Sequence, residues 1–287
     1  MRSTIKRTGY SHYVNMGPIE LRQPIPTSSI DQIDPFVLLH HYGPYKISVD
    51  NNPFDLGPHP HRGFEPITFL IEGEQLHRDS LGNESLVTAG DVQWTTAGRG
   101  IIHAEGPSKD FVNKGGVLEG IQLWLNLPAN KKMIPAQYQH VKSENFAVEK
   151  SINNKISVQI VAGSLNGLNG KIETQTDVNA YIIDAKQGGM HVITLDKTHQ
   201  SLVYLIKGEV IINDVVLSEN KKQLIEFNSD GDHFSIVANK NSKLLFLSGV
   251  PLKEEVTTYG PYVMNTQTEI MEAMRDYQKG KMGFLPA

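Results

Sequence analysis

The stretch PHPHRGFEPITFLIEGE, from Pro58 to Glu74, places two histidines two residues apart and follows them with an apolar run that ends at a glycine. Successive side chains of a strand point to opposite faces, so His59 and His61 are expected on the same face, about 7 Å apart along the backbone. Two imidazoles at this spacing can converge on one metal ion. The apolar run is typical of a strand that ends in a turn.

The strand pattern continues through most of the chain. Short β-branched or aromatic runs alternate with Gly, Asn, Asp and Pro, as in GIQLWLNLP, ISVQIVAG, SLVYLIKGEVIIND and KLLFLSG. This pattern predicts an all-β sandwich or barrel. The C-terminus is the exception, because Thr266 and Glu269 form a capping-box signal and Gly280 supplies a stop. A helix is predicted there, with one face formed by Ile270, Met271, Met274 and Tyr277.

Length and composition limit the class of protein. The 287 residues are 39% hydrophobic, which is enough for one large domain or two of ordinary size. The 27 basic and 31 acidic residues form no long block of one sign, which disfavours direct nucleic-acid binding and anionic membranes. Cysteine is absent, so the strong metal ligands are His, Asp and Glu. The N-terminal sequence lacks the apolar region of a secretory signal, and no apolar run is long enough to span a membrane; a cytoplasmic protein is predicted.

An internal repeat predicts two copies of one β unit. The sequence TFLIEGE at 68–74 matches VYLIKGE at 203–209, 135 residues later, and AGD ending at Asp91 matches DGD ending at Asp232, 141 residues later. Strand and glycine turns also recur by chance in all-β proteins, which is the alternative. The stretch LPANKKMIPAQYQH has the prolines and lysines of a linker. We therefore predict a first barrel over 1–134 and a second barrel with the terminal helix over 135–287.

A second pair of potential ligands follows the first. The sequence GRGIIHAEGP contains His103 and Glu105, again two residues apart on a predicted strand. Two such strands facing one another in a small barrel would supply three imidazoles and one carboxylate. This set suits a divalent first-row ion with octahedral preference and leaves about two positions open for water or substrate. A structural zinc site would more often use cysteine and close its tetrahedron. An isolated His-x-His is usually a solvated strand face or a pair of hydrogen-bonded core histidines, but the second pair favours the metal.

Other polar residues give weaker signals. Glu65 has the strand parity of His59 and His61, so it is a candidate ligand, outer-shell acceptor or base, unless the chain bulges at Gly63. Arg62 is expected to pair with a carboxylate at the rim or to lie on the surface. Three other histidines of this half, His40, His41 and His77, have no partner at ligand spacing, so structural roles are favoured. Gln122 and Trp124 alternate together and are expected to line the pocket, although core packing also explains the tryptophan.

These motifs together resemble the pirin family of the cupin superfamily. The resemblance rests on HPHRGFEPITFLIEGE, GDVQWTTAGRGIIHAE, IQLWLNLP and the tail YGPYVMNTQTEI, and covers nearly the whole chain. It implies a bicupin fold of two packed β-barrels and one iron site in the first barrel, with ligands His59, His61, His103 and Glu105. Other cupins use the glutamate at the position of Glu65. Thr96 replaces a proline of the general cupin motif, and His40 and His41 stand where pirins usually have an aspartate.

The resemblance also implies an activity. Bacterial pirin-like proteins are similar to quercetinases, which open the heterocyclic ring of a flavonol with dioxygen and release carbon monoxide. Fe(II) is the expected metal, with Ni, Mn, Co, Cu and Zn as alternatives, and Glu105 or Glu65 is the expected base. Eukaryotic members resemble iron-containing transcriptional cofactors that bind a protein partner, so a redox-sensing binding protein is the alternative function. A carbohydrate or small-molecule isomerase on the cupin scaffold is a third hypothesis. The expected substrate pocket consists of Phe54, Arg62, Phe64, Phe69 and Gln122.

The second barrel is expected to hold no metal. The offsets of the repeat align His59 with Thr194, His61 with Asp196, His103 with Leu244 and Glu105 with Phe246. One carboxylate beside apolar side chains cannot replace the hydration shell of a divalent ion. One metal per chain is predicted.

Overall fold

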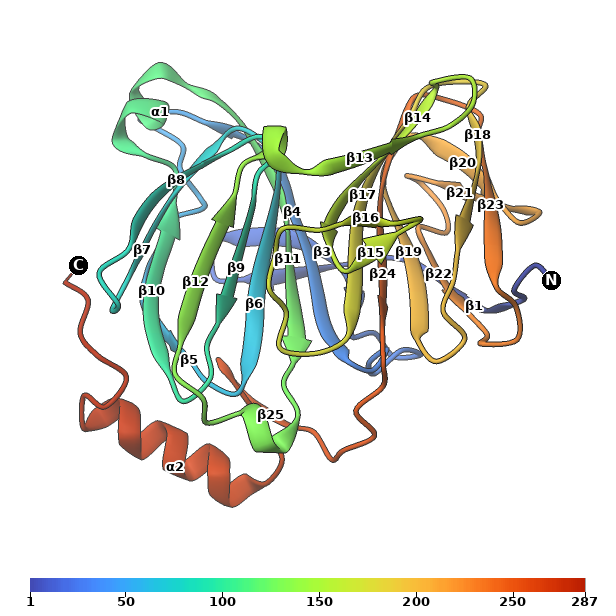
Figure 1. Cartoon of the computed structure of the whole chain (residues 1–287). Coiled ribbons are helices and arrows are strands. Elements are labelled where there is room, and N and C mark those ends of the chain that lie inside the picture. Colours follow the sequence, from blue (N-terminus) through green and yellow to red (C-terminus); the bar gives the residue numbers. More distant parts are fainter. Residues whose placement is uncertain (287) are drawn as a thin grey trace. The chain divides into compact units, whose positions relative to one another are not determined.

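The computed structural model describes residues 1–286 and divides the chain into two compact units (Figure 1). The histidine unit, named for the two histidine pairs that it contains, consists of Tyr13–Arg22, Phe36–Ser143 and the segment from Leu252 onward. The second unit consists of Met1–His12, Gln23–Pro35 and Glu144–Pro251. Both units are built mainly of strands, so the prediction of an all-β chain with two β-barrel units and a C-terminal helix is confirmed.

The histidine unit contains two large sheets. The four-stranded sheet has the order β5 (Leu56–His61), β10 (Ile101–Gly106), β7 (Glu74–Asp79) and β8 (Glu84–Thr88). The seven-stranded sheet has the order β12 (Gln137–Val141), β9 (Val92–Thr96), β6 (Phe64–Glu72), β11 (Gly116–Asn126), β4 (Phe36–Ile47), β3 (Ile19–Ile25) and β2 (His12–Met16). Buried side chains from both sheets, among them Tyr42, Leu70, Val87 and Leu118, form one apolar cluster. The two sheets therefore enclose a common core.

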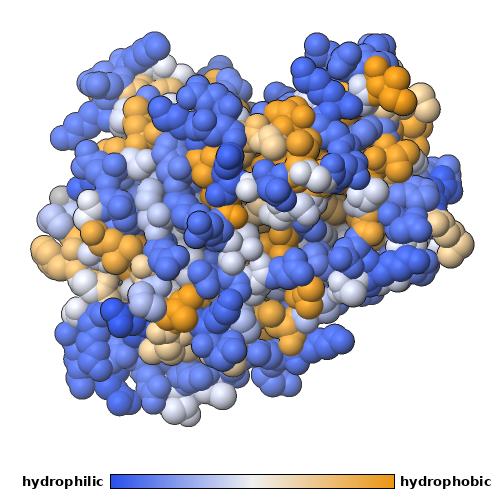
Figure 2. Space-filling model, in the orientation of Figure 1, coloured by the Kyte–Doolittle hydropathy of each residue, from blue (hydrophilic) through white to orange (hydrophobic). Residues whose placement is uncertain are grey.

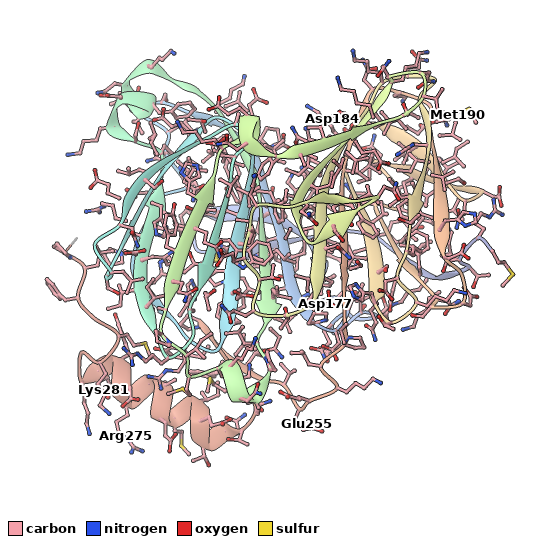
Figure 3. All side chains as sticks on the ribbon, in the orientation of Figure 1. Asp177, Asp184, Met190, Glu255, Arg275 and Lys281 are labelled. Carbon is pink, nitrogen blue, oxygen red and sulfur yellow. The ribbon has the colours of Figure 1, made fainter. Side chains whose placement is uncertain are left out.

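The second unit repeats this arrangement. Its four-stranded sheet has the order β18 (Met190–Thr194), β23 (His233–Ala238), β20 (Glu209–Ile212) and β21 (Val215–Ser218). Its seven-stranded sheet has the order β1 (Ile5–Gly9), β22 (Leu224–Phe227), β19 (Gln200–Lys207), β24 (Ser242–Gly249), β17 (Val178–Ala185), β14 (Ile156–Ala162) and β13 (Ala147–Lys150). Met190, at the start of β18, is 63% exposed and is labelled in Figure 3.

The described residues also contain two strand pairs and four helices. The strand pairs are β15 (Ser164–Leu165) with β16 (Leu168–Asn169), and β25 (Thr257–Tyr259) with β26 (Tyr262–Met264). The α-helices are α1 (Lys109–Lys114) and α2 (Gln267–Gln278), and the 3-10 helices are η1 (Ala129–Lys131) and η2 (Ser143–Asn145). Of the two α-helices in residues 1–286, neither is long and apolar enough to span a bilayer. In the face shown in Figure 2, hydrophilic side chains predominate and hydrophobic ones form small groups.

The repeat is real, but one of its two sequence matches is wrong. TFLIEGE ends β6 and starts β7, and VYLIKGE ends β19 and starts β20, at the same place in the strand order. The turn glycines Gly73 and Gly208 both have positive φ, and a Cβ at either would lie about 2 Å from a neighbouring oxygen. AGD, however, precedes β9, whereas DGD precedes β23, which is the counterpart of β10. The 141-residue offset therefore aligned two different turns.

The predicted C-terminal helix is confirmed with its cap, but a different face is buried. Helix α2 begins after Thr266, whose side chain accepts from the backbone of Glu269 in a capping box. The buried residues are Ile270 and Ala273, whereas the predicted face members Met271, Met274 and Tyr277 are exposed. The small Ala273 lets the helix approach Tyr262, Met264 and Met282, which belong to the same cluster. Helix α1 was not predicted; Ser108 caps its N-terminus.

The segment predicted as a linker belongs to the histidine unit. It contains η1 and the start of β12, and β12 pairs with β9 over Gln137 to Val141. The buried Lys132 donates from Nζ to Gly63 O at 2.7 Å and to Val263 O at 3.0 Å. The boundary between the two repeated halves at residues 134 and 135 stays a prediction. Strand β12 follows this boundary in the sequence.

Candidate metal centre

Three imidazoles meet on one face of the four-stranded sheet. Strands β5 and β10 are direct antiparallel neighbours, with His103 opposite His59 and Ile101 opposite His61. The ring centroids are 4.4 Å apart for His59 and His103, 4.7 Å for His61 and His103, and 4.8 Å for His59 and His61. The two predicted strands thus lie side by side in one sheet rather than facing one another across the barrel. The three rings still form a group whose ligand atoms lie within 4.8 Å of one another.

The nitrogens of these rings fit a metal ion. Nδ1 of His59 lies 2.8 Å from Gly57 O, and Nδ1 of His61 lies 3.2 Å from Pro261 O. A carbonyl only accepts, so these contacts direct the proton to Nδ1 and leave a lone pair on Nε2. Nε2 of His61 and both ring nitrogens of His103 are buried and have no hydrogen-bond partner in residues 1–286. Burial, reinforced by the neighbouring histidines, lowers the pKa of His61 and His103 well below the usual range, so both rings are neutral.

Glu105 is buried beside this group and also lies close to a fourth histidine, His77. Its Oε2 accepts from Gln122 Nε2 at 3.2 Å, and its Oε1 accepts from Gln93 Nε2. Within residues 1–286, its carboxylate forms a second metal-capable group with His77 and His103, whose ligand atoms also lie within 4.8 Å of one another. The prediction that Glu105 binds the same ion as His59 and His61 stays a prediction.

His77 is the residue that sequence reasoning missed. It lies on β7 directly opposite Glu105 on β10, and its side chain is completely buried. No partner at ligand spacing was recognised for His77 in the sequence, so a structural role is favoured there. The β7–β10 register brings it to Glu105, and no short-range spacing encodes that register.

Two residues predicted for the site face away from the histidines. Gly63 has a φ of 87°, and the chain turns there between β5 and β6, so the strand parity of His59 does not continue to Glu65. On β6, Phe64 packs edge-on to His61 and Thr68 donates to Glu105, whereas Glu65 and Phe69 have the opposite parity. Glu65 instead accepts from Thr96 at 2.6 Å, and burial raises its pKa to about 7. The structure therefore does not bring Glu65 or Phe69 to the metal-capable groups.

A row of partly exposed side chains lies on the face of the seven-stranded sheet that is turned toward Glu105 of the four-stranded sheet. Gln122 pairs with His40 and Trp124 pairs with Leu38 across β11 and β4, and all four are partly exposed between fully buried neighbours. Gln122 contacts Glu105, which fixes the side on which this row lies. Trp124 Nε1 donates to Gln122 Oε1 at 3.4 Å. Burial lowers the pKa of His40 to about 4, so its ring is neutral.

The other two predicted pocket residues have structural contacts. Phe54 is buried and stacks on Tyr42, with ring centroids 4.3 Å apart. Arg62 is buried too, and donates to Asp276 on α2 at 3.1 Å and to Arg99 O at 2.7 Å. The carboxylate partner expected for Arg62 is thus present, but it comes from the C-terminal helix.

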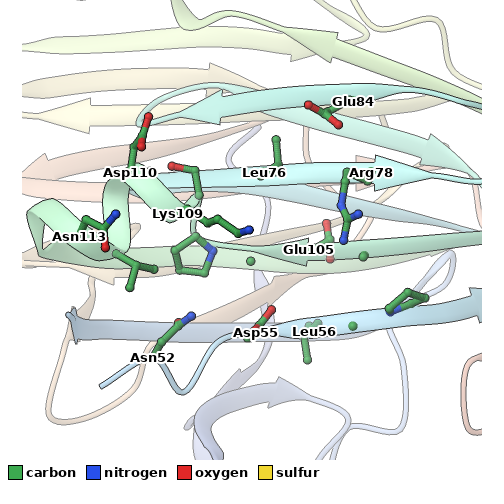
Figure 4. A pocket seen from close by; sticks show the side chains of 17 residues that line it. Asn52, Asp55, Leu56, Leu76, Arg78, Glu84, Glu105, Lys109, Asp110 and Asn113 are labelled. Carbon is green, nitrogen blue, oxygen red and sulfur yellow. The ribbon is translucent and has the colours of Figure 1, made fainter. Parts of the chain in front are cut away.

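A cavity of about 970 Å³ is lined by residues of the four-stranded sheet (Figure 4). It lies against the face of that sheet opposite to the face that carries His59, His61 and His103. Leu76, Arg78 and Ala104 line it, and along β7 and β10 these residues alternate with His77, His103 and Glu105. Glu105 borders the cavity, although its side chain is buried. None of the five residues predicted for the substrate pocket lines it.

The register of the second unit corrects the sequence alignment of the repeat. Ile212, which the 135-residue offset aligns with His77, pairs with Ile236, so Ile236 is the counterpart of Glu105. By the same register, Phe234 replaces His103 and its partner Ile193 replaces His59. The earlier assignments to Leu244, Phe246 and Thr194 were wrong because they depended on the 141-residue match or on a shift of one residue. The true counterparts all belong to the apolar core of the second unit.

Two protein-family models match separate segments of the chain, one in each repeated half. The family described as pirin matches residues 19–125, and the pirin C-terminal cupin domain matches residues 180–283. The crystal structure of a quercetin 2,3-dioxygenase from Acinetobacter baumannii is 32% identical, covers 99% of each chain and has a TM-score of 0.90. Pirin of Homo sapiens is 33% identical over 92% of this chain and 88% of its own length. A pirin-like protein of Solanum lycopersicum is 35% identical over 92% of this chain and 87% of its own. The chain therefore has the two-barrel cupin fold and belongs to the pirin family.

Proposed function

We propose that the chain is a metal-dependent quercetin 2,3-dioxygenase, which opens the heterocyclic ring of a flavonol with dioxygen and releases carbon monoxide. The observation that carries the proposal is the group formed by His59, His61 and His103. Buried ring nitrogens of His61 and His103 have no hydrogen-bond partner in residues 1–286, and Glu105 lies nearby. The likeness to the quercetin 2,3-dioxygenase of Acinetobacter baumannii over the full chain supports it.

The donor set determines which cofactor the proposal includes. Neutral imidazoles with a carboxylate nearby suit a divalent first-row ion, and we propose Fe(II), with Ni, Mn, Co, Cu or Zn as alternatives. Such an ion, held by the three histidines, would supply Lewis acidity for an aromatic hydroxyl and redox chemistry with dioxygen.

The protein side chains have separate tasks in this proposal. Glu105 accepts the proton of the flavonol hydroxyl, because its carboxylate is buried next to the histidines and two glutamine amides orient it. The partly exposed row of Leu38, His40, Gln122 and Trp124 receives the planar substrate. The rings of Trp124 and Phe64 are 4.3 Å apart at an interplanar angle of 35°. The burial of His61 and His103 keeps water away from the reacting atoms.

The test is a quercetin assay on chain that has been purified without oxygen and loaded with metal. We expect dioxygen uptake and carbon monoxide release in equal amounts, both dependent on the metal. Relatives named pirin match the chain as closely as the quercetinase does. A metal-loaded chain that binds quercetin without consuming dioxygen would favour the alternative, a redox-sensing binding protein that acts through a protein partner.

A further inference from the structure

His77 has the environment of a metal ligand, although it lies outside the first group of histidines. Its Nε2 is 3.1 Å from Oδ2 of Asp79, and a carboxylate only accepts, so Nε2 carries the proton. Its Nδ1 is buried and has no hydrogen-bond partner in the described residues. A ligating histidine commonly donates its other N–H to a carboxylate in this way. The ring also stacks on Tyr138 at 4.1 Å and an interplanar angle of 8°, which fixes its plane.

The strand register places two further ligands next to this ring. On β10, Glu105 lies opposite His77 and His103 lies opposite Asp79. The centroids of His77 and His103 are 5.5 Å apart, and Nδ1 of His103 is 4.0 Å from Oε1 of Glu105. Neither nitrogen of His103 has a hydrogen-bond partner in residues 1–286, so this ring can offer a lone pair to either side.

We propose that His77, His103 and Glu105 form a second position for a divalent first-row metal ion, adjacent to the position formed by His59, His61 and His103. Two histidines and one carboxylate are a donor set that binds such ions and leaves coordination positions open. The Glu105 carboxylate and Asp79 behind His77 compensate the charge of the ion. A neutral imidazole has one lone pair, so His103 serves one position at a time and a single ion occupies the two positions alternately.

The experiment is a Co(II) titration of metal-free full-length chain, followed by visible absorption and by elemental analysis after gel filtration. A His59→Ala, His61→Ala chain should still bind one Co(II), with affinity roughly 100-fold weaker and an altered spectrum. Adding His77→Phe, which preserves a ring against Tyr138, should remove this binding. Adding His191→Phe instead should not, because that histidine lies in the second unit and bonds to Glu149.

Two results would overturn the second position. One is a His59→Ala, His61→Ala chain that binds no Co(II) but keeps its β-sheet circular dichroism. The other is binding in that chain that survives His77→Phe. If the His77→Phe chain does not fold, Glu105→Gln in the same background provides the equivalent test, with loss of Co(II) expected and retained binding contradicting the proposal. The readout is metal binding, so the result does not depend on whether the chain oxidises flavonols.

Discussion

His103 lies directly opposite His59 across the β5–β10 pair, and their ring centroids are 4.4 Å apart. Because His103 belongs to both metal-capable groups, His103→Ala should leave neither position able to hold an ion. We expect no stoichiometric Fe(II) or Co(II) by elemental analysis, no quercetin turnover, and an unchanged β-sheet circular dichroism spectrum. His140→Ala is the matched control, since that histidine bonds to Ser85 and Asp91 outside both groups. Full metal occupancy in His103→Ala would contradict the assignment.

Gln122 orients Glu105, so its removal should affect turnover more than metal binding. Gln122→Leu keeps the volume but removes the amide that donates to Glu105 Oε2 at 3.2 Å. We expect kcat for quercetin to fall roughly tenfold, which corresponds to about 1.4 kcal/mol, with the metal content unchanged. Gln159→Leu in the second unit should leave kcat unchanged. If kcat is unaffected in Gln122→Leu, the amide does not position the base.

The buried Glu65 should make stability depend on pH. Burial raises its pKa from the usual 4.5 to about 7, so the folded chain holds this proton more tightly than the unfolded chain. Its contribution to stability is therefore complete below pH 4.5 and is lost as pH rises through about 7. Glu65→Gln removes this loss and should stabilise the chain at pH 8 relative to pH 5 by roughly 1–3 kcal/mol.

Urea unfolding of both chains at the two pH values measures this difference. An identical effect of Glu65→Gln at pH 5 and pH 8 would show that Glu65 is ionised in the folded chain. Metal content should be the same in both chains, because Glu65 faces away from the histidines.

Lys132 connects the turn after the first histidine pair to the C-terminal segment. Its buried ammonium donates to Gly63 O, to Asn126 Oδ1 and to Val263 O at 2.7, 2.5 and 3.0 Å. Lys132→Met leaves these three acceptors without a donor and should lower the free energy of unfolding by roughly 2–4 kcal/mol. Lys131→Met, at the neighbouring and partly exposed position, should cost less than about 1 kcal/mol. Equal effects in urea unfolding would show that the buried ammonium has no special role.

Local patterns predicted much of this protein. The period of two along a strand places His59 and His61 on one face, and the same rule applies to His103 and Glu105, because it depends only on backbone geometry. The capping box at Thr266 and Glu269 predicted the start of α2, because its hydrogen bonds also join residues that are close in the sequence. The match between TFLIEGE and VYLIKGE predicted the repeat, since both sequences need a glycine with positive φ at the turn.

Other features depended on contacts between distant segments. The α2 face was predicted from spacing alone, but the surface against which the helix packs selects Ile270 and Ala273. The offset of 141 residues failed because a three-letter turn motif recurs at turns that are not equivalent.

The sequence alone determined that this chain carries two i, i+2 pairs of potential metal ligands within a duplicated all-β fold, because strand periodicity is a local property. Only the tertiary structure decided which side chains share a pocket. The turn at Gly63 reverses the parity of Glu65, and the register of β7 against β10 brings His77 to Glu105. Both depend on how strands pair across the sheet, and pairing is set by the packing of the whole barrel rather than by the spacing of residues along one strand.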